Sequence, residues 1–241
     1  MRRSIPLLRG SKGYSWYGKY KEGGEAAFLK FVPPTPFAWP KLEAGPRPMA
    51  YFDIKIGNNF FHMINFIWIL TILDAEDVGR LEFELASDIV PKTVTNFANL
   101  CEGKGLKFKR GYKNTKIHHI LKGVFIMGGD IEKENGKGNH SSFEQRHFSD
   151  ENFIIPHSGR GLICMASSGI HTNGSQFYIS LGDNSYMNGR CVVFGRLVKG
   201  DDVLTAIEKV FTFRGVPARQ ISINDCGFIE KPEKEIEKNN K

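Results

Sequence analysis

Alternating apolar and polar residues mark several short strands along this chain. Within residues 79–86, the side chains of Leu81, Phe83 and Leu85 fall on one face of an extended segment, and charged side chains fall on the other. This alternation is typical of a strand with one buried face. The same pattern, or a short apolar run bounded by glycine, predicts further strands at 50–57, 117–126 (as two short strands), 192–197 and 221–229.

Two segments have helical spacing instead. Apolar residues recur at three- to four-residue intervals within residues 90–103, where Pro91 suits the first helical turn and Gly103 suits the stop. A second helix is predicted at 201–210, which begins with two aspartates. Many short strands, few helices and frequent glycine turns predict a mainly β domain, a closed antiparallel barrel with helical caps.

The joint between the first two predicted strands is unusually long and apolar. Residues 58–73 are mostly apolar but include His62 and Asn65, and they are fewer than the roughly 20 residues that a membrane-spanning helix needs. We therefore interpret 58–73 as an insertion packed on the domain. The alternative is an aberrant segment, such as translated non-coding sequence.

The basic residues are concentrated near the N-terminus. The chain has 241 residues and a net charge of +7, and residues 1–50 alone hold nine Lys or Arg against three Asp or Glu. Prolines and glycines without a sustained period predict an extended or disordered extension over 1–48. We expect one domain over 49–229 and a charged tail over 230–241. Since the excess charge belongs to the extension, we expect no nucleic-acid binding by the domain; an N-terminal arm for nucleic acid or organelle targeting is a secondary interpretation.

The four cysteines are far apart in sequence and form no C-x-x-C pair. This spacing favours a reducing compartment over a zinc site or a disulfide framework. No secretory signal is evident, because only four residues separate Ser4 from Arg9. We expect a cytoplasmic monomer without membrane association, and mitochondrial and nuclear locations are the alternatives.

Residues 163–179 form the stretch around which the rest of the chain is organised. An apolar run leads into a loop of small polar residues and glycines, and a strand-like run leaves it. Such side chains compete with the backbone for hydrogen bonds and disfavour a buried helix. We expect the loop to line an open groove, with backbone groups and the Gln176 amide facing a ligand. The alternative is that Gln176 is a buried amide satisfied by its own loop.

Taken together, these motifs resemble the cyclophilin family of peptidyl-prolyl cis–trans isomerases. The resemblance covers residues 50–229 except 58–73, and it implies a mainly β, cyclophilin-like closed eight-stranded antiparallel barrel capped by two helices. The matching segments include Gly79-Arg80-Leu81-Glu82-Phe83-Glu84-Leu85, Pro91-Lys92-Thr93, Gly128-Gly129-Asp130, Asn135-Gly136-Lys137-Gly138, Asp150-Glu151-Asn152-Phe153, Thr172-Asn173-Gly174-Ser175-Gln176-Phe177 and Val192-Val193-Phe194-Gly195.

The reaction that the resemblance implies has simple physical requirements. Rotation about a peptide bond faces a barrier of about 18–20 kcal/mol. Because no covalent bond is made or broken, neither a metal nor another cofactor is expected. A catalyst must bind the twisted amide better than either planar form. An apolar pocket for the proline ring and a donor aimed at the proline nitrogen are sufficient.

The resemblance also implies the roles of particular residues. Gln176 would bind peptide backbone, and Phe125 and Tyr178 would line the proline pocket. His119 stands where the family has its catalytic arginine, and Met127 stands where a glutamine would hold that arginine. The other residues implied at the substrate site are Val124 in place of a pocket phenylalanine, Gly136, Ala166, Ser167, Ser168, Tyr186 in place of a tryptophan, Met187 in place of a leucine and Cys191 in place of a histidine.

These departures all weaken the chemistry. A histidine is mostly neutral at pH 7, whereas an arginine is always charged. His119 is either a replacement donor or a tolerated substitution, and Cys191 is expected to be an inert buried thiol. We expect a weakly active isomerase of X-Pro bonds in exposed segments, or an inactive module that binds proline-containing clients. Cyclosporin-type ligands should bind weakly, because Val124 makes the pocket shallower and Tyr186 replaces the tryptophan.

Overall fold

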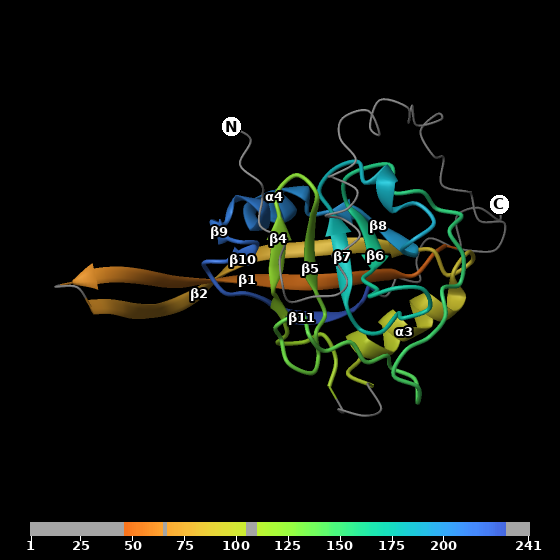
Figure 1. Ribbon diagram of the computed structural model, residues 1–241, viewed down its shortest axis with the longest axis horizontal. Coiled ribbons are helices and arrows are strands. Elements are labelled where there is room, and N and C mark those ends of the chain that lie inside the picture. The colour runs from red at the N-terminus through yellow and green to blue at the C-terminus, as the bar shows by residue number, and fades with distance from the viewer. Residues whose placement is uncertain (1–45, 65–66, 105–109, 230–241) are drawn as a thin grey trace, which may run out of the picture.

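A computed structural model describes residues 46–64, 67–104 and 110–229 (Figure 1). One antiparallel sheet has the strand order β3-β11-β1-β2-β8-β6-β7-β5-β4. Its strands are β1 (Met49–Ile64), β2 (Ile67–Leu85), β3 (Lys116–Ile117), β4 (His119–Leu121), β5 (Phe125–Gly128), β6 (Leu162–Met165), β7 (Phe177–Ser180), β8 (Val193–Lys199) and β11 (Ile221–Phe228).

The sheet curls into a nearly closed barrel. Its two terminal strands, β3 and β4, follow one another in the chain and are separated only by His118. The His118 backbone N–H donates to the Met127 carbonyl at 3.0 Å, across to β5. When β3 and β4 are taken as one interrupted strand, the barrel has eight strands. The predicted mainly β barrel is therefore confirmed.

Within the described residues, two α-helices accompany the barrel, as the sequence pattern predicted. Helix α3 (Pro91–Cys101) buries Val94, Phe97 and Leu100 against the sheet, because residues three or four apart share one helical face. Helix α4 (Asp201–Lys209) begins with two aspartates, which favour the positive end of the helix dipole. Three short elements were not predicted: the 3₁₀ turn η2 (Ser185–Met187) and the hairpin of β9 (Thr212–Phe213) and β10 (Val216–Pro217).

Aromatic rings fill the barrel beneath helix α3. The ring of Phe52 lies 5.3–5.8 Å from those of Phe97, Tyr112 and Phe177, measured between centroids. The buried Tyr112 hydroxyl donates to the Ser175 carbonyl at 2.8 Å. This core contact ties the glycine-rich loop before β7 to the centre of the fold.

The long joint between the first two strands is itself a β-ribbon. Strands β1 and β2 remain paired from the barrel out to Ile64 and Ile67, and the ribbon projects away from the barrel (Figure 1). The backbone of 58–64 and 67–73 thus continues the hairpin, whereas the sequence pattern predicts an insertion packed on the domain. Sequence neighbours that run antiparallel satisfy each other's backbone hydrogen bonds without help from the rest of the sheet.

The described start of the chain lies against the barrel. Arg47 is buried and forms two hydrogen bonds of 2.8 Å with the Asp88 carboxylate, and the Leu85 N–H donates to the Pro48 carbonyl at 3.0 Å. The rest of the predicted extension, 1–45, and the predicted tail, 230–241, lie outside the described residues. Among the helices of the described part, none is both long and apolar enough to cross a membrane.

Candidate functional site

Neighbouring strands place four of the described side chains in one row. His119 on β4 is paired with Met127 on β5, Met127 with Tyr178 on β7, and Tyr178 with Cys164 on β6. Directly opposed residues in a sheet point to the same face, so these four side chains share the outer face of the barrel wall. Phe125, two residues before Met127, is on this face as well. We call His119, Met127, Tyr178, Cys164 and Phe125 the strand row.

His119 occupies the end of the strand row. Its ring centroid lies 6.2 Å from that of Phe125, and the side chain is half-buried. Burial lowers the pKa of His119 below its usual value of 6.5, because desolvation disfavours the imidazolium. The imidazole is therefore neutral at pH 7 and donates through one N–H at most.

Aromatic packing defines the middle of the strand row. Tyr178 is buried, and its ring lies 5.6 Å from that of Phe125 and stacks on His157 at 6.2 Å with an interplanar angle of 15°. Burial raises the pKa of Tyr178 well above 10, and the neighbouring thiols of Cys164 and Cys191 raise it further. The phenol is thus a neutral, mainly apolar surface near His119.

Gln176 lies beside the strand row and is held by another loop. Its side-chain nitrogen donates to the carbonyl of Gly136 at 3.1 Å and to that of Gly138. Its backbone N–H donates to Asn139 Oδ1 at 2.9 Å. Both amide hydrogens are therefore used inside the molecule, and Gln176 braces the segment 136–139 in this structure.

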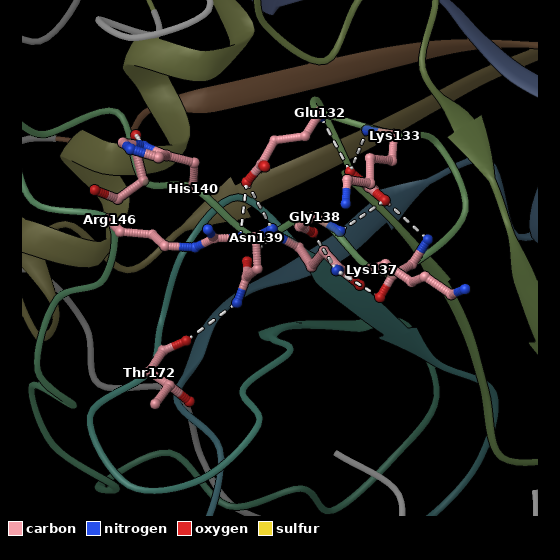
Figure 2. A network of polar contacts seen from close by, with 12 residues as sticks. Glu132, Lys133, Lys137, Gly138, Asn139, His140, Arg146 and Thr172 are labelled. Carbon is pink, nitrogen blue, oxygen red and sulfur yellow. Dashed lines mark hydrogen bonds and ion pairs between the residues drawn. The ribbon is translucent and has the colours of Figure 1, made fainter. Parts of the chain in front are cut away.

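That segment belongs to a dense polar network, shown in Figure 2. Glu132 Oε1 accepts from the Asn139 N–H at 3.0 Å and from Arg146 at 3.3 Å, and Asn139 Nδ2 donates to the Thr172 carbonyl at 3.1 Å. The buried Asp130 carboxylate accepts from backbone N–H groups at 2.9–3.1 Å. These five donors belong to Glu132, Lys133, Asn135, Gly136 and Gly138.

These donors determine the charge state of Asp130. Burial alone would raise its pKa, but the backbone hydrogen bonds outweigh burial and lower it below 3.8. The carboxylate is therefore ionised throughout the neutral range. It fixes the shape of the loop that carries Gly136, Gly138 and Asn139.

A family model matches the part of the chain that contains these residues. The family model described as "Cyclophilin type peptidyl-prolyl cis-trans isomerase/CLD" matches residues 70–228. The chain belongs to this cyclophilin-type family. The matched residues include the strand row and the loop network. Strand β1 precedes the matched residues, but it pairs with β2 and β11 in the same sheet.

One asparagine connects the remaining positions to which the resemblance assigns a role in the proline pocket. Asn184 Nδ2 donates to the Val124 carbonyl at 2.8 Å, and its carbonyl accepts from the Met187 N–H at 2.7 Å. Val124 and Tyr186 are half-buried, whereas Met187 is buried. Asn184 thus ties the turn before β5 to η2, so that residues 60 positions apart lie together.

The small-residue loop lies between Gln176 and Cys191. The Ala166 N–H donates to the Gln176 carbonyl at 2.9 Å, and Ser167 Oγ lies 4.0 Å from Cys191 Sγ. Cys191 is buried and its pKa is raised by that burial, as an inert thiol requires. Ser168 is exposed and its N–H donates to Thr172 Oγ1 at 2.9 Å.

Two histidines in loops, His140 and His157, are buried. Burial lowers the pKa of His157 to about 4, although its hydrogen bond with Asn188 opposes this. Neither histidine follows an apolar period, and only the three-dimensional contact with Tyr178 reveals His157 as part of the site. In the described part of the chain, no group of three or more His, Cys, Asp and Glu side chains is arranged to bind a metal.

Asn139 is the other residue that the sequence did not single out. It contacts three separated segments, through Glu132, Thr172 and Gln176. Its position after the Gly-Lys-Gly motif was the available signal, since glycines often let a chain approach closely. A Cβ on Gly174 would lie 2.3 Å from Asn139 Oδ1, so the glycine leaves the space that Asn139 needs.

Proposed function

We propose that the protein is a slow isomerase of X-Pro bonds in exposed segments of proline-containing clients. Membership of the cyclophilin-type family supports this reaction class. The observation that carries the proposal is the strand row, in which an apolar surface of Phe125, Met127 and Tyr178 adjoins the imidazole of His119. The proline ring would pack on the apolar surface, with its amide directed towards the imidazole.

The rate would come from preferential binding of the twisted amide. As the C–N bond rotates, resonance is lost and the lone pair localises on the proline nitrogen. A neutral imidazole N–H can donate to this lone pair, and such a bond contributes about 0.5–1.5 kcal/mol. A charged donor contributes about 1.5–3 kcal/mol, so a neutral donor predicts the slower catalyst.

A second candidate is a module that binds proline-containing segments without isomerising them. Two observations favour it: the pKa of His119 is lowered by burial, and its strand partner is Met127, whose side chain has no N–H to donate. In this case the apolar surface would still bind the proline ring. The two candidates therefore predict different isomerisation rates but similar affinities for a proline-containing peptide.

Rate and affinity measured on one X-Pro peptide separate the candidates. Exchange between the cis and trans forms can be followed by NMR at pH 7.5, together with the dissociation constant. We expect measurable acceleration, which His119→Ala lowers while affinity remains within about threefold, since the donor acts mainly on the twisted state. Lys199→Ala, at an exposed position on β8 outside the candidate site, is the control. Binding without acceleration would overturn the isomerase proposal in favour of the binding module.

The pH profile provides an independent reading of the same donor. Protonation of His119 would convert it to a charged donor, and its lowered pKa places this step below pH 6.5. We expect the acceleration to rise between pH 7 and pH 5, and His119→Ala to remove this rise.

We further propose that the protein acts as a monomer and binds cyclosporin-type ligands weakly, because Val124 offers a small surface and Tyr186 is half-buried. Tight binding measured by calorimetry would contradict the proposal of weak ligand binding.

A further inference from the structure

The hairpin of β9 and β10 lies directly against His119. The Ile120 N–H donates to the Gly215 carbonyl at 2.8 Å, which attaches the hairpin to β4 (Figure 1). A Cβ added at Gly215 would lie 2.0 Å from Cε1 and 2.6 Å from Nε2 of His119. Gly215 has φ +83°, so both its backbone conformation and the space require glycine. The tip of this hairpin is therefore one wall of the His119 environment.

The residue before this glycine is an arginine in an unusual conformation. Arg214 has φ 52°, in the left-handed region of backbone conformation that residues other than glycine rarely adopt. It is exposed, and its guanidinium carbon lies 5.4 Å from the centroid of the Phe213 ring. The hairpin thus carries a cation at the tip, next to the residue that contacts His119.

The charge of Arg214 has no counter-charge in the described part of the protein. None of the described carboxylates lies within 4.0 Å of it, whereas most other described arginines form an ion pair. These are Arg47, Arg80, Arg110, Arg146, Arg160, Arg196 and Arg219. An unpaired guanidinium remains available to a ligand, and its planar fork of N–H groups suits carbonyl and other oxygen acceptors.

We propose that Arg214 contacts the bound prolyl peptide beside His119 and supplies the positively charged donor that this part of the site otherwise lacks. This inference rests on the proposed function. The guanidinium donates to a peptide carbonyl next to the rotating X-Pro bond and so helps to bind the peptide, while Phe213 and Val216, which are 67% and 57% exposed, offer apolar surface to neighbouring peptide residues. Because Arg214 is exposed, solvent screens its charge, and the isomerase remains slow.

The test compares variants that leave the hairpin backbone intact. Arg214→Asn removes the charge and retains a residue that tolerates positive φ. Arg214→Lys retains the charge without the fork. Lys199→Asn is the control, since it removes one exposed charge on β8, several strands away from β4. The Ile120 amide signal, which reports the bond to Gly215, verifies that the hairpin is unchanged.

The readouts are the cis–trans exchange rate of an X-Pro peptide at pH 7.5 and its dissociation constant. We expect Arg214→Asn to reduce kcat/KM by about tenfold or more, Arg214→Lys to reduce it by less, and Lys199→Asn to leave it unchanged. If the natural protein accelerates exchange and Arg214→Asn matches Lys199→Asn, the inference is wrong and the proposed function stands.

Affinity decides the matter if the natural protein does not accelerate exchange. The proposed isomerase function then fails, but the contact is still measurable. A peptide affinity that Arg214→Asn weakens about tenfold relative to Lys199→Asn upholds the contact. Equal affinities of the two variants overturn it.

Discussion

Two neighbouring parts of the candidate site, the loop network and the strand row, are held together by different interactions. In the loop network, Asp130 accepts five backbone N–H groups, and Gln176 and Asn139 are bonded to loops on both sides. In the strand row, the buried side chains of Phe125, Met127 and Tyr178 form an apolar cluster that ends at the neutral, half-buried imidazole of His119. The network holds its geometry through internal bonds, whereas the row is held by apolar packing and is the part that we propose contacts the proline ring.

This difference separates the scaffold of the site from its chemistry. A fully bonded polar network fixes a loop, because each partner lost would leave a buried group unsatisfied. An apolar row tolerates replacement of its members, since packing depends mainly on volume. The two departures that the resemblance implies, at His119 and Met127, fall in the row, whereas Gly-Gly-Asp and Gly-Lys-Gly, which match the family motifs in that resemblance, fall in the network around Asp130.

The largest expected effect comes from breaking the network at its centre. Asp130→Asn removes the charge that accepts five backbone donors and places a side-chain NH₂ among them. We expect the free energy of unfolding in urea to fall by about 3 kcal/mol or more. Glu134→Gln is the matched control, because Glu134 forms partly exposed ion pairs with Arg110 and Lys116 and should cost less than about 1 kcal/mol. Equal costs for the two variants would contradict a central role for Asp130.

Lowering the pH should destabilise the packing of His157 on Tyr178, next to the strand row, before it protonates Asp130 in the network. The pKa of His157, stacked on Tyr178, is lowered from 6.5 to about 4 by burial. Between these values the unfolded chain binds a proton that the folded protein does not, so stability falls as pH falls below 6.5. The loss for this one group between pH 6.5 and pH 4.5 is about 2–3 kcal/mol.

The same titration distinguishes the two regions. The lowered pKa of Asp130 leaves its stabilising charge intact above about pH 4, so its contribution is lost only in stronger acid. His157→Gln should therefore flatten the stability profile between pH 6.5 and pH 4.5. An unaltered profile in that variant would assign the acid sensitivity to other groups. His118, whose pKa is also lowered to about 4 by burial, accounts for part of what remains.

A smaller effect is expected where the network meets the row. Gln176→Ala removes the donors to the carbonyls of Gly136 and Gly138. We expect the free energy of unfolding to fall by about 1–2 kcal/mol and peptide affinity to fall only as far as the loop loosens. Hydrogen exchange at Gly136 and Asn139 would report that loosening. If affinity falls strongly while exchange at these amides is unchanged, Gln176 binds the peptide directly.

Much of the fold was predictable because its signals are local. The alternation at Leu81, Phe83 and Leu85 and the helical spacing in 90–103 lie within single elements, and the structure contains both. The hairpin at Arg214 and Gly215 was not predicted, because its role depends on contact with a strand about 95 residues earlier. The pairing of β1 with β2 beyond residue 57 was not predicted, because an apolar run does not specify whether it packs on the domain or pairs as strands.

The sequence indicates candidate residues for the site, but it does not indicate which hydrogen bonds and contacts hold them in place. The family resemblance implies roles for His119, Met127 and Tyr178, which stay predictions, and the strand register brings the three residues into one row. The bonds of Asn139 and the burial of His157 arise between loops that are distant in sequence. Loop-to-loop contacts have no sequence period, so only the structure reveals them.

The most direct test of the account restores a charged, held donor to the strand row. His119 and Met127 are opposed on β4 and β5, so His119→Arg combined with Met127→Gln would place an arginine beside an amide acceptor. The measurement is kcat/KM for one X-Pro peptide at pH 7.5, for this variant and for the natural protein. The account predicts an increase of about ten- to a hundredfold. A ratio near one, with peptide affinity retained, would contradict the claim that the neutral donor at His119 limits the reaction.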